Sequence, residues 1–147
     1  MAIRSVRWLP VAAAVLIPIL LSACNSAREM PVYAVRGQLL IQKQPAANAL
    51  VIFTPVQDAQ PEKWPKGFPR GKVGEDGAFQ LTTYRDDDGA PAGEYAVTVL
   101  WLVKNKDDEE SEFDRLQGRY ADPAASKIRI EVKADRKGNK IEPIHLN

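Results

Sequence analysis

From residue 32 onward, apolar and polar residues repeatedly alternate with a period of two, the pattern of β-strands that have one buried face. The clearest case is Lys127–Lys133, in which Ile128, Ile130 and Val132 alternate with charged residues. No window longer than ten residues has convincing helical periodicity. This pattern excludes a helical bundle and predicts an all-β domain.

Six segments are expected as strands, and a seventh strand is expected at Arg70–Val73. Asp76–Gly77 is a strong hairpin signal, and Lys137–Asn139 is the turn that joins the last two strands. Short strands separated by Pro and Gly predict an antiparallel sandwich, interrupted here by insertions at 56–70 and 104–126. The six segments are 35–41, 50–53, 79–83, 95–103, 127–133 and 140–146.

The strand at 95–103 is unusual because both of its faces become apolar. One face is apolar from Tyr95 to Val103, and the other turns apolar at Leu100 and Leu102. Such a strand is either central in a covered region or part of an exposed patch.

The first residues have the order of a secretory signal. A basic head with Arg4 and Arg7 precedes an uncharged stretch at 8–21, which is shorter than the about 20 residues of a membrane-spanning helix. The next residues, up to Cys24, complete the sequence Leu-Ser-Ala-Cys, which resembles the lipobox of bacterial lipoproteins. The resemblance implies a signal peptide at 1–23 and a diacylglycerol on the thiol of Cys24. The alternative is an ordinary signal peptide with a chance cysteine.

Removal of residues 1–23 takes away Arg4 and Arg7 and no acid, which changes the formal charge from +1 to −1. A tether at 24–31 then precedes one domain at 32–147. Its residues 25–31 span roughly 25 Å when fully extended, so the domain stays close to its membrane. We expect a lipid-anchored protein of the bacterial cell envelope that faces the periplasm or the exterior.

Four turn-and-strand segments follow one another after the tether: Val35–Pro55, Gly74–Tyr84, Gly89–Val99 and Arg119–Ser126. In this order they resemble bacterial lipoproteins with a carboxypeptidase regulatory-like, or transthyretin-like, domain. The resemblance covers about residues 33–147 and implies a seven-stranded Greek-key sandwich of prealbumin type. Asn48 stands where a glycine is usual, and asparagine tolerates the left-handed conformation that the turn needs. Such domains mostly serve as accessory, structural or adhesive modules.

Several function classes are excluded by residue types that are scarce. Cys24 is the only cysteine and His145 the only histidine, which excludes multi-thiolate and multi-histidine metal sites. Transthyretin-like hydrolases use several histidines, so their activity is not expected here, and His145 is expected on the strand face opposite Ile144 and Leu146. The near-zero charge provides no basic field for nucleic acid. We expect no catalytic activity and no cofactor.

Two acidic clusters have competing interpretations. Asp86 and Asp88 are weak calcium candidates, and the alternative is a solvated turn between strands. The acid-rich run at 107–112 is expected to be extended by charge repulsion, with contact to a basic partner as the alternative.

The loop Pro61–Arg70 holds the best candidates for a contact surface. Trp64, Phe68 and Arg70 lie on this proline-rich loop, and Trp101 lies at the apolar end of its strand. The leading hypothesis is a structural or protein-interaction module that binds an unknown envelope protein through these residues. The alternative is a carbohydrate-binding module for cell-wall or extracellular glycans. In a third interpretation, Trp64 and Phe68 fold back and cap the sandwich.

Overall fold

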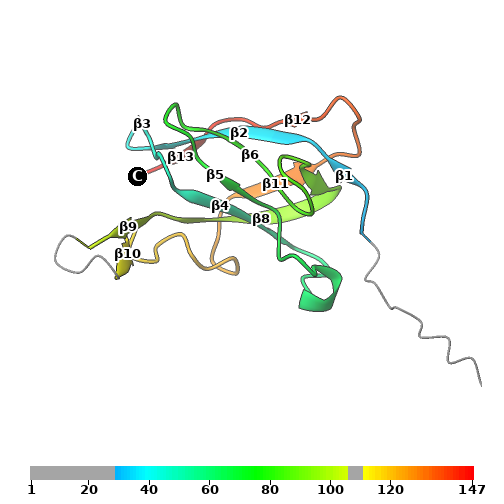
Figure 1. Ribbon diagram of the computed structural model, residues 1–147, viewed down its shortest axis with the longest axis horizontal. Helices are drawn as coiled ribbons and strands as arrows, with labels where there is room; N and C mark the ends of the chain where they lie inside the picture. Colours follow the sequence, from blue (N-terminus) through cyan, green and yellow to red (C-terminus); the bar gives the residue numbers. More distant parts are fainter. Residues whose placement is uncertain (1–28, 106–110) are drawn as a thin grey trace, which may run out of the picture.

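The computed structural model describes residues 29–105 and 111–147 (Figure 1). The expected signal peptide, Cys24 with most of the expected tether, and the acids at 107–110 therefore lie outside the described residues. Within the described part, the chain consists of strands, turns and one short 3-10 helix, so the all-β prediction is confirmed. None of the helical structure in these two ranges is long and apolar enough to cross a membrane.

The strands follow the order of the expected segments, with additional short strands between them. Their bounds are β1 (Val32–Tyr33), β2 (Val35–Ile41), β3 (Gln44–Pro45), β4 (Leu50–Pro55), β5 (Arg70–Lys72), β6 (Ala78–Gln80), β7 (Ala90–Pro91), β8 (Gly93–Leu100), β9 (Leu102–Lys104), β10 (Glu112–Asp114), β11 (Arg129–Val132), β12 (Asn139–Lys140) and β13 (Ile144–Leu146), with the helix η1 at Pro61–Lys63.

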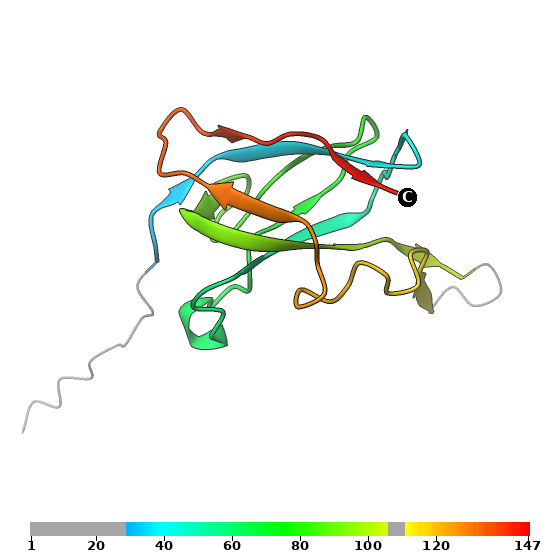
Figure 2. The same cartoon turned by 180° about the vertical axis from the view of Figure 1, so that it is seen from behind.

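Two sheets face each other and enclose the core, as both views show (Figures 1 and 2). One sheet has the strand order β11-β8-β4-β5, and the other is centred on β2, which pairs with β3, β6, β12 and β13. The β5–β6 hairpin connects the sheets, because β5 pairs with β4 while β6 pairs with β2. The fold is therefore a β-sandwich.

Aromatic side chains from both sheets fill the middle of the sandwich. The ring centroids of Phe53 on β4 and Tyr95 on β8 are 5.8 Å apart, and Phe79 on β6 lies 6.4 Å from Phe53. The Tyr95 hydroxyl donates a hydrogen bond of 2.7 Å to the Pro91 carbonyl, so its polar group is satisfied although the residue is buried.

The prediction of a purely antiparallel sandwich is wrong for the C-terminal strands. β12 and β13 both run parallel to β2, with Asn139 beside Val35 and Ile144 beside Leu39. The reason is the loop 133–138, which crosses from one sheet to the other and returns the chain at the end where β2 begins (Figure 2). The expected single strand 140–146 is also divided in two, with Pro143, which has no N–H, in the gap.

Strand β8 combines both situations expected for its two apolar faces. It is central between β11 and β4, and Ala96 and Thr98 on its outer face are buried at 3% and 4% exposure. The loops that carry η1 and residues 115–127 lie on this side of the sheet (Figure 1). Beyond the break at Trp101 the chain continues as β9, where Leu102 is 46% exposed.

Candidate interaction site

Trp64 is buried by its own loop and the sandwich. It follows η1, is 6% exposed and belongs to the main core cluster. Its indole Nε1 donates a hydrogen bond of 3.1 Å to the carbonyl of Asp58, and its ring packs edge-on against Phe68 at 5.6 Å. Trp64 therefore stabilises the loop and offers no open ring face to a sugar or a protein.

Phe68 is half-buried and packs against the same core cluster. The pair therefore takes the position expected of residues that cap the sandwich. Because the glycan hypothesis relied on aromatic stacking from this loop, the burial of Trp64 removes its main support.

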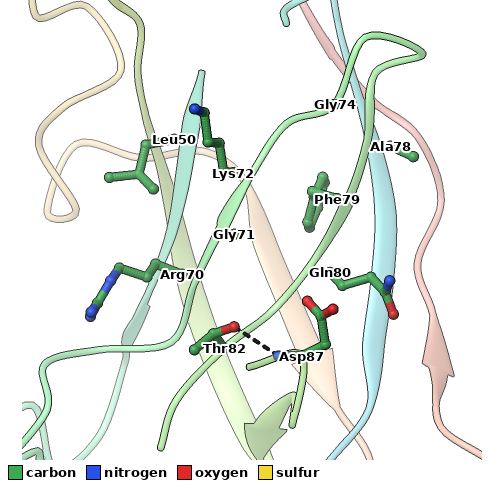
Figure 3. Close-up of a pocket in the computed structure, with 10 residues that line it drawn as sticks. All are labelled: Leu50, Arg70, Gly71, Lys72, Gly74, Ala78, Phe79, Gln80, Thr82 and Asp87. Carbon is green, nitrogen blue, oxygen red and sulfur yellow. Dashed lines mark hydrogen bonds between the residues drawn. The ribbon is translucent and has the colours of Figure 1, made fainter. Parts of the chain in front are cut away.

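Arg70 remains exposed and lines a groove between β5 and β6 (Figure 3). Its guanidinium donates a hydrogen bond of 2.9 Å to the carbonyl of Lys66, which holds the side chain along its own loop. The groove has a volume of about 470 Å³, and its other charged side chains are Lys72 and Asp87. Its one aromatic residue, Phe79, is only 3% exposed, so the groove has no stacking platform.

A close approach of two strands shapes this groove. Gly71 lies so near β6 that a Cβ built on it would be 2.5 Å from the carbonyl oxygen of Gln80. Any larger residue at position 71 would force β5 and β6 apart, so the shape of the groove depends on Gly71.

The Asp86–Asp88 turn is organised by backbone hydrogen bonds. The Asp88 carboxylate accepts the N–H groups of Thr83 (2.7 Å), Tyr84 (3.0 Å) and Arg85 (2.9 Å). Asp86 is exposed, and no group of three His, Cys, Asp or Glu side chains arranged to hold a metal occurs within 29–105 and 111–147. The turn alternative accounts for the position of Asp88.

Trp101 lies where the sandwich passes into the β9–β10 hairpin. Its Nε1 donates a hydrogen bond of 3.1 Å to the carbonyl of Ala47, which ties it to the β3–β4 turn. The guanidinium of Arg115 lies 4.1 Å from the ring centroid, and the Arg115 N–H donates to the Trp101 carbonyl at 2.9 Å. The half-buried indole thus fixes the base of the hairpin, and the exposed Arg115 covers one face of its ring.

Asp114 also stabilises the base of the hairpin, because its carboxylate accepts three backbone N–H groups. Burial would raise the pKa of its carboxyl, but the N–H groups of Trp101, Leu116 and Gly118 donate to it and together lower the pKa below its usual value. The three hydrogen bonds measure 3.0, 3.0 and 2.9 Å. A charged Asp114 therefore holds the start of β9 against the turn that follows β10.

The hairpin itself presents apolar side chains to solvent. β9 and β10 project from the sandwich at the end opposite to β1 (Figures 1 and 2). Phe113 is 53% exposed and lies opposite Val103, whereas Leu102 lies opposite Asp114. Residues opposite each other share a face of the ribbon, so Phe113 and Leu102 lie on different faces. We call the apolar residues of the hairpin, Val103 and Phe113 on one face and Leu102 on the other, the hairpin patch.

The structure thus separates the four residues that the sequence proposed as contacts. Trp64 and Phe68 belong to the core and its cap, Arg70 lines the β5–β6 groove, and Trp101 supports the hairpin patch. His145 is exposed between the buried Ile144 and Leu146, as expected. Sequence reasoning missed Phe113.

Comparisons with known proteins leave the family open. No profile of a known protein family matches this chain, and no curated protein matches it. The crystal structure of a variant of BcpA, the major pilin subunit of Bacillus cereus, is similar to 79% of this chain with a TM-score of 0.43 and 12% identity. The match spans 30% of the pilin chain, and a likeness this distant carries no argument about function.

Proposed function

We propose that this chain is a lipid-anchored, non-catalytic protein of the bacterial cell envelope that binds a protein partner through the hairpin patch. The observation that carries the proposal is the exposure of Phe113 (53%) and Leu102 (46%) on a hairpin whose base is held by Trp101, Asp114 and Arg115. Aromatic residues, phenylalanine included, are enriched in the buried cores of protein interfaces, and an ordered support lowers the entropy that binding costs.

The anchor is part of the proposal and rests on the sequence. Cys24 follows Leu-Ser-Ala at the end of an uncharged stretch, which favours acylation of its thiol. Two or three acyl chains give stable attachment, because each buried CH₂ contributes about 0.8 kcal/mol. The envelope location follows from the same residues.

The finer assignment of the fold also belongs to the proposal. We infer a sandwich of the carboxypeptidase regulatory-like or transthyretin-like type, because three of the four resembling segments contain strands with their turns, and the fourth, Arg119–Ser126, forms turns ahead of β11. The turn before β4 supports it: Asn48 has φ +68°, the left-handed conformation in which glycine is usual.

The partner hypothesis is tested with a double variant, Leu102→Ser/Phe113→Ser, and the matched control Val56→Ser. Val56 is 45% exposed, close to the exposed fraction of Leu102, but it lies beside Glu94 at the other end of β8. The control therefore removes an equally exposed apolar side chain far from the hairpin. Affinity capture from membranes identifies the wild-type partner, and its binding is then measured with each purified protein. The proposal predicts binding about 30-fold weaker or worse in the double variant and unchanged in the control. Equal binding by all three proteins would contradict it.

The anchor is tested separately by Cys24→Ser. We expect this variant to lose metabolic lipid labelling and to disappear from the membrane fraction. Val56→Ser is expected to keep the label and to remain in the membrane fraction. Unchanged labelling of Cys24→Ser would refute the lipoprotein assignment without affecting the hairpin test.

A further inference from the structure

A second surface, on the outer face of the β2 sheet, gathers positive charge. Arg36 on β2 and Lys140 on β12 lie side by side in the parallel register, and Lys137 lies in the β11–β12 loop just before β12. These three residues line a shallow groove of about 810 Å³, in which Glu142 is the only acidic side chain. We call Arg36, Lys137 and Lys140 the basic groove.

No ion pair among the described residues neutralises the charges of the basic groove. The ion pairs within 29–105 and 111–147 are Lys63–Asp58 and Arg85–Glu29, and neither involves the groove. The Nε of Arg36 donates to the neutral side chain of Gln80 at 3.0 Å. Like charges on neighbouring strands repel, so this arrangement gains stability from an external anion.

The adjoining loop adds to the same field. Lys133 and Arg136 are exposed beside the groove, whereas the Asp135 carboxylate accepts the N–H of Lys137 at 2.9 Å and shapes the turn. Within the groove and the adjoining loop, five basic residues are therefore accompanied by two acidic ones, Asp135 and Glu142. This is the charge balance of a surface that attracts polyanions.

The groove lies at the end of the molecule where the described chain begins. The Asn139 N–H donates to the Ala34 carbonyl at 2.7 Å, and Gly138 packs against the same residue. The β11–β12 loop and the start of β1 lie at one end of the sandwich, whereas the hairpin patch lies at the other (Figure 2). Only the segment 25–28 separates Glu29 from Cys24, which allows roughly 18 Å when fully extended.

We propose that the basic groove binds the anionic phospholipid headgroups of the membrane that holds the Cys24 anchor, and thereby points the hairpin patch away from the bilayer. This inference rests on the anchor in the proposed function. The short tether matters because attraction to a charged surface decays over about 8 Å at physiological salt. The anchor keeps the groove close to the bilayer, and the groove selects the orientation.

The test uses the acylated mature protein, residues 24–147, reconstituted in vesicles, with a fluorophore on Ala134→Cys, an exposed and uncharged position of the β11–β12 loop, and a headgroup-bound quencher. Vesicles of phosphatidylethanolamine with about 30% phosphatidylglycerol are compared with vesicles that contain phosphatidylcholine instead. A fluorophore on Glu75→Cys, an exposed position in the β5–β6 turn, reports on the body of the sandwich away from the groove.

The proposal predicts quenching at position 134 in the anionic vesicles only, with loss of this quenching at about 0.5 M salt. Position 75 stays unquenched in both vesicles. The variant Arg36→Gln/Lys137→Gln/Lys140→Gln loses the effect, whereas the matched charge-removal control Lys43→Gln/Lys72→Gln/Lys104→Gln keeps it. Equal quenching in both vesicle types, or in both triple variants, would overturn the proposal.

Mass analysis of the same preparation shows whether Cys24 carries lipid, so a failed anchor is distinguished from a failed groove. If Cys24 carries none, the chain is mixed with the two kinds of vesicle and its partitioning is measured. Partitioning into anionic vesicles that falls about 100-fold in the first triple variant still supports the groove. Partitioning independent of lipid charge overturns it.

Discussion

The guanidinium of Arg115 lies 4.1 Å from the ring centroid of Trp101, at the point where the sandwich ends and the hairpin begins. The same two residues are joined through their backbones, since the Arg115 N–H donates to the Trp101 carbonyl. The segment after β10 is therefore attached to the end of β8 by a ring contact and a backbone hydrogen bond. Because its base is fixed in this way, the hairpin holds Phe113 and Leu102 exposed on opposite faces of an ordered ribbon.

The order of the hairpin base is expected to depend on pH through Asp114. Three backbone N–H groups hold the pKa of this carboxyl below its value in the unfolded chain, after outweighing the opposite effect of burial. The stabilisation is therefore complete above the unfolded pKa, about 4, and is lost as the pH falls through the lowered folded value. NMR shifts of the N–H groups of Trp101, Leu116 and Gly118 between about pH 6 and pH 2 measure it. In Asp114→Asn these shifts should no longer follow one titration; an unchanged titration would contradict the account.

Gly89 is expected to tolerate no side chain. It has φ +96°, and a Cβ would lie 1.9 Å from the carbonyl oxygen of Tyr33. Gly118 has a similar φ of +74° but nothing within 4 Å of the added Cβ, so Gly118→Ala costs only the conformational strain, about 1 kcal/mol. Urea unfolding should show a much larger loss of unfolding free energy for Gly89→Ala. Similar losses for both variants would show that β1 does not pack against this turn.

Tyr95 is expected to stay protonated in the folded protein at pH values at which exposed tyrosines ionise. Burial, with a smaller contribution from Tyr84, raises the pKa of its hydroxyl. Because this pKa is higher in the folded than in the unfolded chain, the contribution of Tyr95 to the free energy of unfolding is complete below the unfolded pKa, about 10. It is lost as the pH rises above that value. An alkaline absorbance titration should show one tyrosine that ionises only on unfolding, and this step should vanish in Tyr95→Phe. The same variant leaves the Pro91 carbonyl without its donor, which costs about 1 kcal/mol.

The two tryptophans of the described chain should differ in their contribution to stability. Trp64→Ala removes a side chain that is 6% exposed, and such changes cost about 3–5 kcal/mol. Trp101 is half-buried, so Trp101→Ala should cost less while weakening the base of the hairpin. Chemical unfolding of both variants measures the difference. If Trp64→Ala were as stable as the wild type but failed to bind the partner, the contact surface would lie on the η1 loop and not on the hairpin.

The strands could be predicted because each one follows a local rule. The alternation from Val35 to Ile41 coincides with β2, and Asn48 adopts the left-handed conformation that its turn requires. The parallel pairing of β12 and β13 with β2 could not be predicted in the same way. Alternation specifies which face of a strand is buried, but it does not specify the neighbour or its direction.

The position of the aromatic residues depended on contacts distant in sequence. The η1 loop is rich in Pro, Lys and Arg, which is typical of exposed loops, yet Trp64 is buried. A signal did exist: the outer face of β8 carries Ala96 and Thr98, small residues that a loop can cover. Phe113 gave no signal, since its strand has three residues and lies inside a segment without periodicity.

Partner binding at the hairpin patch is tested in growing cells by a photo-cross-linking amino acid placed at position 113, with position 56 as the matched exposed site. We expect one dominant protein adduct from position 113 and no adduct of that protein from position 56. The adduct should persist in Arg36→Gln/Lys140→Gln, which alters the basic groove and not the hairpin patch. The same adducts from both positions, or no protein adduct from position 113, would contradict a partner surface on the β9–β10 hairpin.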